Sequence, residues 1–211
     1  MDLPLVTCIM PTANRPEFIV SAVGFFLEQD YPNAELVIID DGSRSYASLI
    51  PPTPKIRYFY TKPLGTIGRK RNFACENAKG EFIVHWDDDD SYALNWISKS
   101  VEQLLASSAD VTGLKSIVFY SMARGSSFLY QNSNQHPQWL CGATLTYRKA
   151  LWSAYRFANL QVGEDIDFLL NSGGKVAELD YKDGFAANLH ANNTSIRFLG
   201  KDVLDWMETE P

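Results

Sequence analysis

Four consecutive aspartates, Asp87 to Asp90, form the most unusual chemical group in the sequence, within the segment HWDDDDS. Adjacent carboxylates repel one another, so a folded protein keeps such a run where it is solvated or where a cation lies among them. Mg²⁺ and Mn²⁺ prefer oxygen ligands and commonly use one or two carboxylates together with substrate phosphates. Because an apolar stretch typical of a buried strand directly precedes this run, we favour a metal- and phosphate-binding loop over a solvated acidic turn.

A second acidic pair, Asp40 and Asp41, ends another apolar stretch in the segment VIIDDGS. The dipeptide Asp41-Gly42 is also a common turn signal, and a plain turn is the alternative. We expect Asp40 to accept a hydrogen bond from a nucleobase N–H, with Asp41 beside it holding ribose or base. A carboxylate accepts but cannot donate, which favours a base edge that bears an N–H, such as that of uracil or guanine.

Positive charge is concentrated in the segment LGTIGRKRN, where Gly65 and Gly68 permit close backbone approach before and within a predicted helix. Such a segment can hold a pyrophosphate or orient the acidic loop, although basic residues on a helix are more often a solvated face. Arg71 and Asn72 are the residues expected on the inward side.

Two further groups lie in the second half of the chain. Glu164 and Asp165 open the segment EDIDF, where acids either cap a helix or serve as a general base for an acceptor hydroxyl. His190 follows a late apolar segment and is a candidate third metal ligand, with a structural role as the alternative. His85 and His136 are expected to be structural or surface residues.

The surrounding pattern alternates apolar runs with helical periodicity. Strands are predicted in LVTCIM, ELVIID, KIRYFY and EFIVHW; one helix is expected to start at Pro16, another to span Thr66–Ala78 with Gly80 as its C-cap. The helix expected after the acidic loop has apolar residues at a 3.6-residue period. The residues expected to be buried on this helix are Leu94, Ile97, Val101, Leu104 and Leu105. This predicts an α/β fold with a mostly parallel sheet covered on both faces. Both acidic clusters then fall at carboxyl ends of strands, where such sheets bind ligands.

The second half carries shorter, less regular strands and no linker long enough to separate two domains. We therefore expect one domain over residues 1–211, with a first half at 1–108 that carries both acidic clusters, a second half at 109–200 and a tail at 201–211 that could form a short docked helix. Trp139 and Tyr130 are candidate stacking platforms for an acceptor.

Composition excludes some functions. The formal net charge of −6 argues against a general nucleic-acid binder, which is normally basic. The three cysteines are widely spaced and odd in number, which favours free buried thiols. The N-terminal segment does not resemble a signal peptide, and no apolar run approaches the ~20 residues of a transmembrane helix. These features predict a soluble, cytoplasmic protein.

Taken in order, the segments IMPTANRP, VIIDDGS, LGTIGRKRN, GEFIVHWDDDDSY, WLCGATLTYRK and GEDIDF resemble glycosyltransferase family 2 over roughly residues 5–171. The resemblance implies the GT-A fold, a nucleoside-diphosphate sugar donor (UDP-sugar favoured), an unknown hydroxyl acceptor, a divalent cation (Mn²⁺ or Mg²⁺), and inversion at the anomeric carbon. Ala13 stands where the family frequently has an aromatic residue. The Q-x-x-R-W motif of processive synthases is absent, which argues for transfer of one sugar at a time.

The same resemblance assigns site residues. It implies that Pro11, Thr12, Arg15 and Asp40 hold the nucleotide base, that Asp87 or Asp88 holds ribose, that Asp89 and Asp90 surround the metal, and that Asp165 is the catalytic base. A nucleotidyltransferase is an alternative enzyme class, although the glycine-rich phosphate loop that such enzymes carry after the first strand is absent. A catalytically silent sugar-nucleotide-binding subunit is the alternative outside enzymes.

Overall fold

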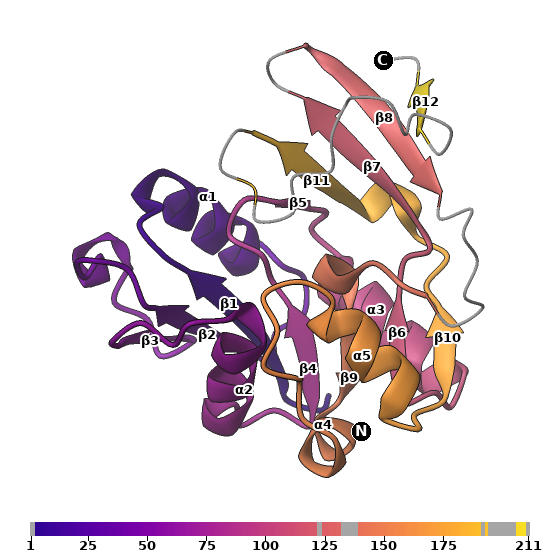
Figure 1. The fold of residues 1–211 in the computed structure, drawn as a ribbon, viewed down its shortest axis with the longest axis horizontal. Helices are drawn as coiled ribbons and strands as arrows, with labels where there is room; N and C mark the ends of the chain where they lie inside the picture. Colours follow the sequence, from indigo (N-terminus) through magenta and orange to yellow (C-terminus); the bar gives the residue numbers. More distant parts are fainter. Residues whose placement is uncertain (1–2, 122–123, 132–138, 191–192, 194–205, 210–211) are drawn as a thin grey trace.

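The computed structural model describes residues 3–121, 124–131, 139–190, 193 and 206–209. Its centre is a seven-stranded sheet in the order β10 (Val176–Glu178), β6 (Val111–Gly113), β9 (Thr146–Arg148), β4 (Phe82–His85), β1 (Val6–Thr12), β2 (Ala34–Asp40) and β3 (Ile56–Tyr60). Only β9 runs antiparallel to its neighbours in this sheet. The expected α/β class with a mostly parallel sheet is confirmed (Figure 1).

Helices cover both faces of this sheet because the buried strands alternate their side chains between two apolar clusters. Met10, Ile38 and Val84 pack in one cluster with helices α1 (Pro16–Leu27) and α3 (Trp96–Ala106). Ile9, Val37 and Ile83 pack in the other with α2 (Ile67–Asn77), α4 (Lys149–Ala154) and α5 (Glu164–Asn171). Burial on both faces explains why these strands read as continuous apolar runs.

A second, five-stranded sheet stands beside the carboxyl end of the first (Figure 1). Its order is β12 (Trp206–Thr209), β8 (Ser126–Gln131), β7 (Ser116–Ser121), β11 (Phe185–Leu189) and β5 (Ser91–Tyr92). The short strand β5 follows the acidic loop at once and pairs with β11, which brings the end of β11 next to the aspartates. Three short 3-10 helices, at Ala47–Leu49, Gly142–Thr144 and Lys182–Gly184, complete the described elements.

Several local predictions are wrong. Leu94 and Leu105 are 57% and 48% exposed, because α3 buries Trp96 and Ser100 on its inner face in their place. Helix α2 ends at Asn77 with Ala78 as its C-cap. Gly80 is not the cap; it allows the chain to pass close to the backbone of β1, where a Cβ at this position would lie 2.5 Å from the Thr7 nitrogen.

The tail prediction also fails in part. Residues Trp206–Thr209 form a strand paired with β8 rather than a helix, and the remainder of 201–211 lies outside the described residues. Among the described residues, no helix is long and apolar enough to cross a membrane. The described part of the chain carries its three cysteines as free thiols. Cys8 is buried, as its apolar surroundings in the sequence predict, and so is Cys75, whereas Cys141, expected to be buried for the same reason as Cys8, is partly exposed.

Candidate active site

Three strand ends gather the candidate residues at one edge of the central sheet. Thr12 ends β1 and lies in register with Asp40, which ends β2, while the aspartate run follows β4 on the other side of β1. Parallel neighbours end at the same edge, so Thr12 and Asp88 become adjacent although they are 76 positions apart in the chain. This confirms that the two acidic clusters occupy the carboxyl edge of one sheet.

Two cavities open at this edge and share Pro11, Arg15, Ile67 and Gln161 in their walls. The first, of about 240 Å³, is lined by Asp87 to Asp90 on one side and by the start of α5 with Glu164 and Asp165 on the other. The second, of about 290 Å³, is lined by residues that include Thr12, Asp41, Gly65 and Lys70. Because the two cavities share these four residues, they are adjacent, and together they form a candidate site for an elongated ligand.

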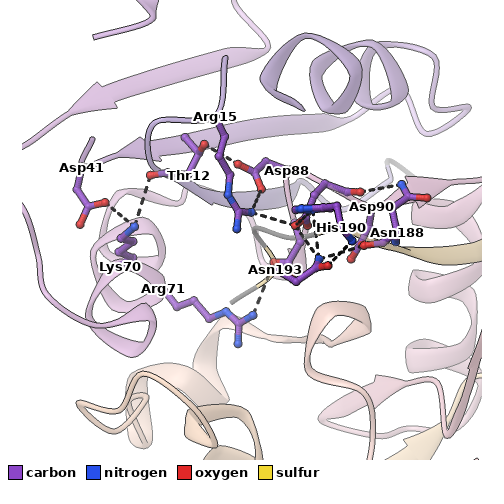
Figure 2. Close-up of polar contacts among 12 residues, drawn as sticks. Thr12, Arg15, Asp41, Lys70, Arg71, Asp88, Asp90, Asn188, His190 and Asn193 are labelled. Atoms are coloured by element: carbon purple, nitrogen blue, oxygen red, sulfur yellow. Dashed lines mark hydrogen bonds and ion pairs between the residues drawn. The ribbon is translucent and has the colours of Figure 1, made fainter. Parts of the chain in front are cut away.

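Thr12 and Arg15 hold the acidic loop in place. The Thr12 hydroxyl donates to Asp88 Oδ2 at 2.6 Å, and one Arg15 nitrogen donates to Asp88 Oδ1 and Asp89 Oδ2, both at 2.9 Å (Figure 2). Burial, followed by the charge of Asp89, raises the pKa of Asp88 to about 6, although Arg15 opposes the shift. Asp88 therefore faces Thr12 and Arg15 as a fixed structural partner more than it faces the cavity.

Asp89 and His190 converge at the end of β11. His190 Nε2 lies 2.9 Å from Asp89 Oδ2, and the imidazole stacks on Phe18 of α1 with ring centroids 4.6 Å apart. The side-chain nitrogen of Asn193 lies 3.3 Å from the same Asp89 oxygen and 3.2 Å from His190 Nε2 (Figure 2). The fold thus brings Asp89 and His190 together from positions 101 residues apart.

Asp90 turns away from this pair and is buried, with 7% of its surface exposed. Its Oδ1 accepts the backbone N–H of Asn188 at 3.2 Å, while the Asn188 side-chain nitrogen donates to the Asp89 carbonyl at 2.7 Å. Burial, together with the charges of Asp89 and Asp87, raises the pKa of Asp90 well above its usual range. Asn188 therefore anchors the acidic loop to β11.

A divalent cation is chemically compatible with Asp89 and His190. Within the described residues no group of three or more His, Cys, Asp or Glu side chains has the arrangement of a metal site. A carboxylate oxygen and an imidazole nitrogen that converge beside a cavity nevertheless match the ligands of Mn²⁺, and substrate phosphates commonly supply the remaining oxygens. A site of this kind is completed by its substrate, not by protein alone.

Arg71 joins the two sides of the first cavity from inside the protein. It is 5% exposed, pairs with Glu164 and lies 3.7 Å from Asp87 Oδ1. Burial raises the pKa of Glu164, with Arg71 opposing the shift. The predicted inward position of Arg71 is thus found, and it orients acids. Asn72 does not face the cavity: its Oδ1 accepts hydrogen bonds from Trp152 Nε1 at 2.9 Å and from the Phe157 amide at 3.1 Å.

Asp165 lines the first cavity at the start of α5, after Gly163 has turned the chain with φ of +87°. Its Oδ1 accepts the Ile166 N–H at 2.9 Å, and its other oxygen lies against Gly142. Asp167, two positions on, points elsewhere and accepts from Tyr155 and Asn171 at 3.1 and 2.8 Å. The Glu164 carboxylate, at the first position of the same helix, pairs with Arg71.

The two aspartates after β2 occupy different surroundings. Asp40 is fully buried; its oxygens accept from the Gly42 amide at 2.9 Å and the Tyr58 hydroxyl at 2.5 Å, and it lines neither cavity. Asp41 lines the second cavity, pairs with Lys70 and accepts the Leu64 N–H at 3.0 Å (Figure 2). Of these two aspartates, Asp41 lines a cavity, whereas Asp40 braces the turn.

Some contributing residues were not predicted. Asn188 and Asn193 flank His190, and the pattern N-x-H-x-x-N after a strand was the only signal for them. Trp139 lines the first cavity as expected, whereas Tyr130 lies behind it, edge-on at 5.9 Å. His136 lies outside the described residues.

Fold and site together define a domain of the GT-A class. The chain belongs to glycosyl transferase family 2, because residues 7–157 match the profile that carries this description. It is 36% identical over 100 residues to the putative colanic acid biosynthesis glycosyl transferase WcaA of Escherichia coli K12, and 30% identical over 110 residues to an uncharacterized glycosyltransferase of Haemophilus influenzae. The matches cover 45% and 50% of this chain but only 36% and 44% of those relatives.

Solved structures share the fold at low identity. Staphylococcus aureus TarS 1-349, in complex with UDP-GlcNAc, superposes with a TM-score of 0.74 at 20% identity, covering 92% of this chain and 62% of that one. The mannosyltransferase PcManGT from Pyrobaculum calidifontis, in complex with GDP-Man and Mn²⁺, gives 0.68 at 17% identity, covering 90% and 57%. The comparisons establish a glycosyltransferase domain and confirm the predicted family and class of enzyme.

Proposed function

We propose that this domain transfers one sugar from a nucleoside-diphosphate sugar to an acceptor hydroxyl, with inversion at the anomeric carbon. One observation carries the proposal: Asp165 and the acidic loop line the same cavity from opposite sides. Inverting transfer needs a base on the acceptor side of the anomeric carbon and charge compensation on the leaving-group side. The carboxylate of Asp165 and the Asp89–His190 pair meet those two needs.

The donor lies along both cavities. Its base and ribose occupy the second cavity, where Asp41 offers a carboxylate to a base N–H and Thr12 borders the same space. The diphosphate passes the shared wall at Arg15 and reaches the acidic loop, so the sugar enters the first cavity. The complexes of TarS with UDP-GlcNAc and of PcManGT with GDP-Man support a donor of this class.

Asp89 and His190 would hold a divalent cation together with oxygens of the diphosphate. Such a cation would neutralise the charge that develops on the leaving nucleoside diphosphate. Asp87 and Asp88 line the first cavity beside these two residues, on the leaving-group side. Asn188 and Asn193 fix the orientation of Asp89 and His190. The Mn²⁺ in the PcManGT complex supports this assignment.

The reaction itself needs one proton transfer and one substitution. Asp165 accepts the proton of the acceptor hydroxyl as its oxygen forms a bond to the anomeric carbon. The bond between that carbon and the diphosphate oxygen breaks on the opposite face, and its electron pair leaves with the nucleoside diphosphate. The acidic-loop aspartates cannot act as the base, because they lie on the leaving-group side.

The test compares two aspartates on one helix. Asp165→Asn keeps the shape of the side chain but removes its basicity, and we expect kcat to fall by about 10²–10⁴-fold with donor affinity near wild type. Asp167→Asn is the matched control, because Asp167 lies two positions on and contacts Tyr155 and Asn171. Turnover is measured as nucleoside-diphosphate release from the donor that binds most tightly in calorimetry, with water as the acceptor hydroxyl. Normal turnover in Asp165→Asn rejects the proposed base.

Base recognition is tested with the other aspartate pair. Asp41→Asn turns an acceptor oxygen into a donor group at the second cavity, so binding of UDP or GDP should weaken. Asp40→Asn should lower stability more than it lowers this affinity, because Asp40 is buried under the turn. Calorimetric titration of both variants with UDP and with GDP decides between them, and weaker binding in Asp40→Asn alone would reverse the assignment.

A further inference from the structure

A buried histidine connects the strand before the acidic loop to the opposite wall of the cavity. His85 is the last residue of β4 and has no exposed surface. Its Nδ1 lies 2.5 Å from the carbonyl oxygen of Gly142, and its Nε2 lies 3.3 Å from the hydroxyl of Tyr147. Phe157 and Tyr147 pack around the ring, with centroids 5.6 and 5.5 Å away. An apolar side chain would fill this position without the free-energy cost of burying two ring nitrogens. The hydrogen-bond partners of the imidazole therefore explain why a histidine occupies it.

The partners fix the protonation of the ring. Burial, reinforced by the positive charge of Arg71, lowers the pKa of His85 well below its usual value, so the ring is neutral at neutral pH. A carbonyl oxygen only accepts, so Nδ1 carries the proton and donates it to Gly142. Nε2 then accepts from the Tyr147 hydroxyl, whose oxygen lies 3.3 Å from Cys75 Sγ. The result is a continuous hydrogen-bonded chain that ends on the Gly142 carbonyl.

Gly142 in turn supports the Asp165 carboxylate. A Cβ added to Gly142 would overlap Asp165 Oδ2 and lie 2.7 Å from its Cγ, and the three nearest atoms to that Cβ all belong to Asp165. The carboxylate therefore rests directly on the glycine backbone. The backbone of the same segment is also tied to β4, because the His85 amide donates to the Leu145 carbonyl at 2.9 Å. Asp165 Oδ1 accepts the Ile166 amide, while Oδ2 lies against Gly142.

We propose that His85 is a positioning residue for the reaction, acting on Asp165 through the Gly142 carbonyl. This inference rests on the proposed function, in which Asp165 is the general base. His85 holds the backbone against which the base lies, while the same strand leads two residues later into the aspartates of the leaving-group side. The distance between base and donor is thereby set by one strand and one buried hydrogen bond.

A pair of substitutions separates the two ring nitrogens. In His85→Asn the amide nitrogen takes approximately the place of Nδ1 and keeps the bond to Gly142. In His85→Gln the amide reaches the place of Nε2 and Tyr147, and the bond to Gly142 is lost. We expect His85→Gln to lower kcat by about tenfold to a hundredfold, the scale of an ångström misplacement, with donor KM unchanged. His85→Asn should retain kcat near the wild-type value.

Gly142→Ala tests the same contact without altering the buried ring. Gly142 does not have a positive φ, so an alanine fits the backbone, and the atoms nearest to its Cβ are those of Asp165. It should lower kcat with donor KM unchanged, as His85→Gln does, and it keeps the inference testable if His85→Gln fails to fold. Turnover is read as nucleoside-diphosphate release with water as acceptor, and thermal unfolding confirms folding.

The outcomes are distinct. Equal kcat in the Asn and Gln variants overturns the inference, as does a loss that appears in donor KM, or a normal kcat in Gly142→Ala. Asp165→Asn is measured alongside them. If its turnover is normal, the proposed base fails; if its turnover falls while His85→Gln and Gly142→Ala stay normal, only the positioning role fails.

Discussion

The buried pair between Arg71 and Glu164 offers the sharpest test of the forces that hold this site together. Arg71 and Glu164 are 5% and 4% exposed, and Asp87 lies 3.7 Å from the same guanidinium. Arg71→Met keeps most of the volume of the side chain but leaves two acids facing each other without their cation. Breaking a buried pair in this way typically costs about 3–5 kcal/mol, because an uncompensated charge stays behind.

The magnitude follows from the geometry. At an effective dielectric constant near 20, each carboxylate within about 4 Å gains roughly 4 kcal/mol from the guanidinium, most of which offsets desolvation in the wild type. Removing Arg71 deletes that gain but leaves the desolvation of Glu164. A loss of about 3–5 kcal/mol is a large part of the 5–15 kcal/mol that stabilises a typical domain.

The assay is urea unfolding monitored by fluorescence. Arg71→Met, Glu164→Gln and the double variant are compared with the wild type in a double-mutant cycle. Glu164→Gln removes the charge, so the double variant should be more stable than Arg71→Met alone. Arg156→Met is the control, since Arg156 and Glu76 form an exposed pair at 2.6 Å, worth about 0–1 kcal/mol.

The pH dependence supplies a second readout of the same variant. Without Arg71, the folded-state pKa of Glu164 rises further above its unfolded value. The folded protein then binds more protons than the unfolded chain, so the variant gains stability as pH falls toward the unfolded pKa. The deficit relative to wild type should shrink from pH 8 to pH 5. A loss below about 1 kcal/mol in Arg71→Met, or a deficit that does not vary with pH, would refute the electrostatic account.

Four further outcomes are expected. Asp90→Asn should stabilise the chelator-treated protein at pH 7.5 by about 1 kcal/mol in thermal unfolding, because burial and the neighbouring carboxylates oppose the charge of Asp90. The control Asp180→Asn, at an exposed position, should give no such gain. An Asp90→Asn variant no more stable than wild type would contradict this prediction. Below pH 6.5 the free energy of unfolding of the wild type should fall by up to about 1.4 kcal/mol per pH unit relative to that of His85→Asn. The reason is that His85 takes up a proton in the unfolded chain, whereas its lowered pKa keeps the folded ring neutral. Parallel curves of stability against pH would exclude this account. Donor affinity, measured by calorimetry, should fall when a chelator is present. His190→Ala should raise the Mn²⁺ concentration needed for activity, measured by metal titration. Equal affinity with and without chelator, and an equal Mn²⁺ requirement in wild type and variant, would exclude a cation at this site.

Much of the fold could be predicted from the sequence because the strands next to β1 are buried on both faces. Val6, Leu36 and Phe82 belong to apolar runs that need no tertiary information to recognise as strands. The aspartates directly after those runs were placed at the carboxyl edge by the same reasoning. Family resemblance then assigned Asp165 to the site from a motif that is locally indistinguishable from a helix start.

The sequence was less informative where exposure depends on what lies opposite. Leu94 and Leu105 match the helical period but lie on the exposed side of the chain, and Trp96 and Ser100 face the core instead. Strand β5 has two residues and forms only because β11 pairs with it. A pairing of this kind depends on a partner almost a hundred positions away, and local propensity carries no record of it.

By itself, then, the sequence determined the class of fold, the edge that carries the site and the chemistry of the acids there. Tertiary structure decided which acid does what. Asp40 and Asp41 are adjacent and identical in type, yet the turn buries one under Tyr58 and leaves the other in a cavity. His85 gives no signal beyond being one histidine in an apolar strand, and only the fold brings the Gly142 carbonyl to its Nδ1. The physical reason is that side-chain roles are set by long-range contacts and burial, whereas strand and helix periods are properties of neighbouring residues.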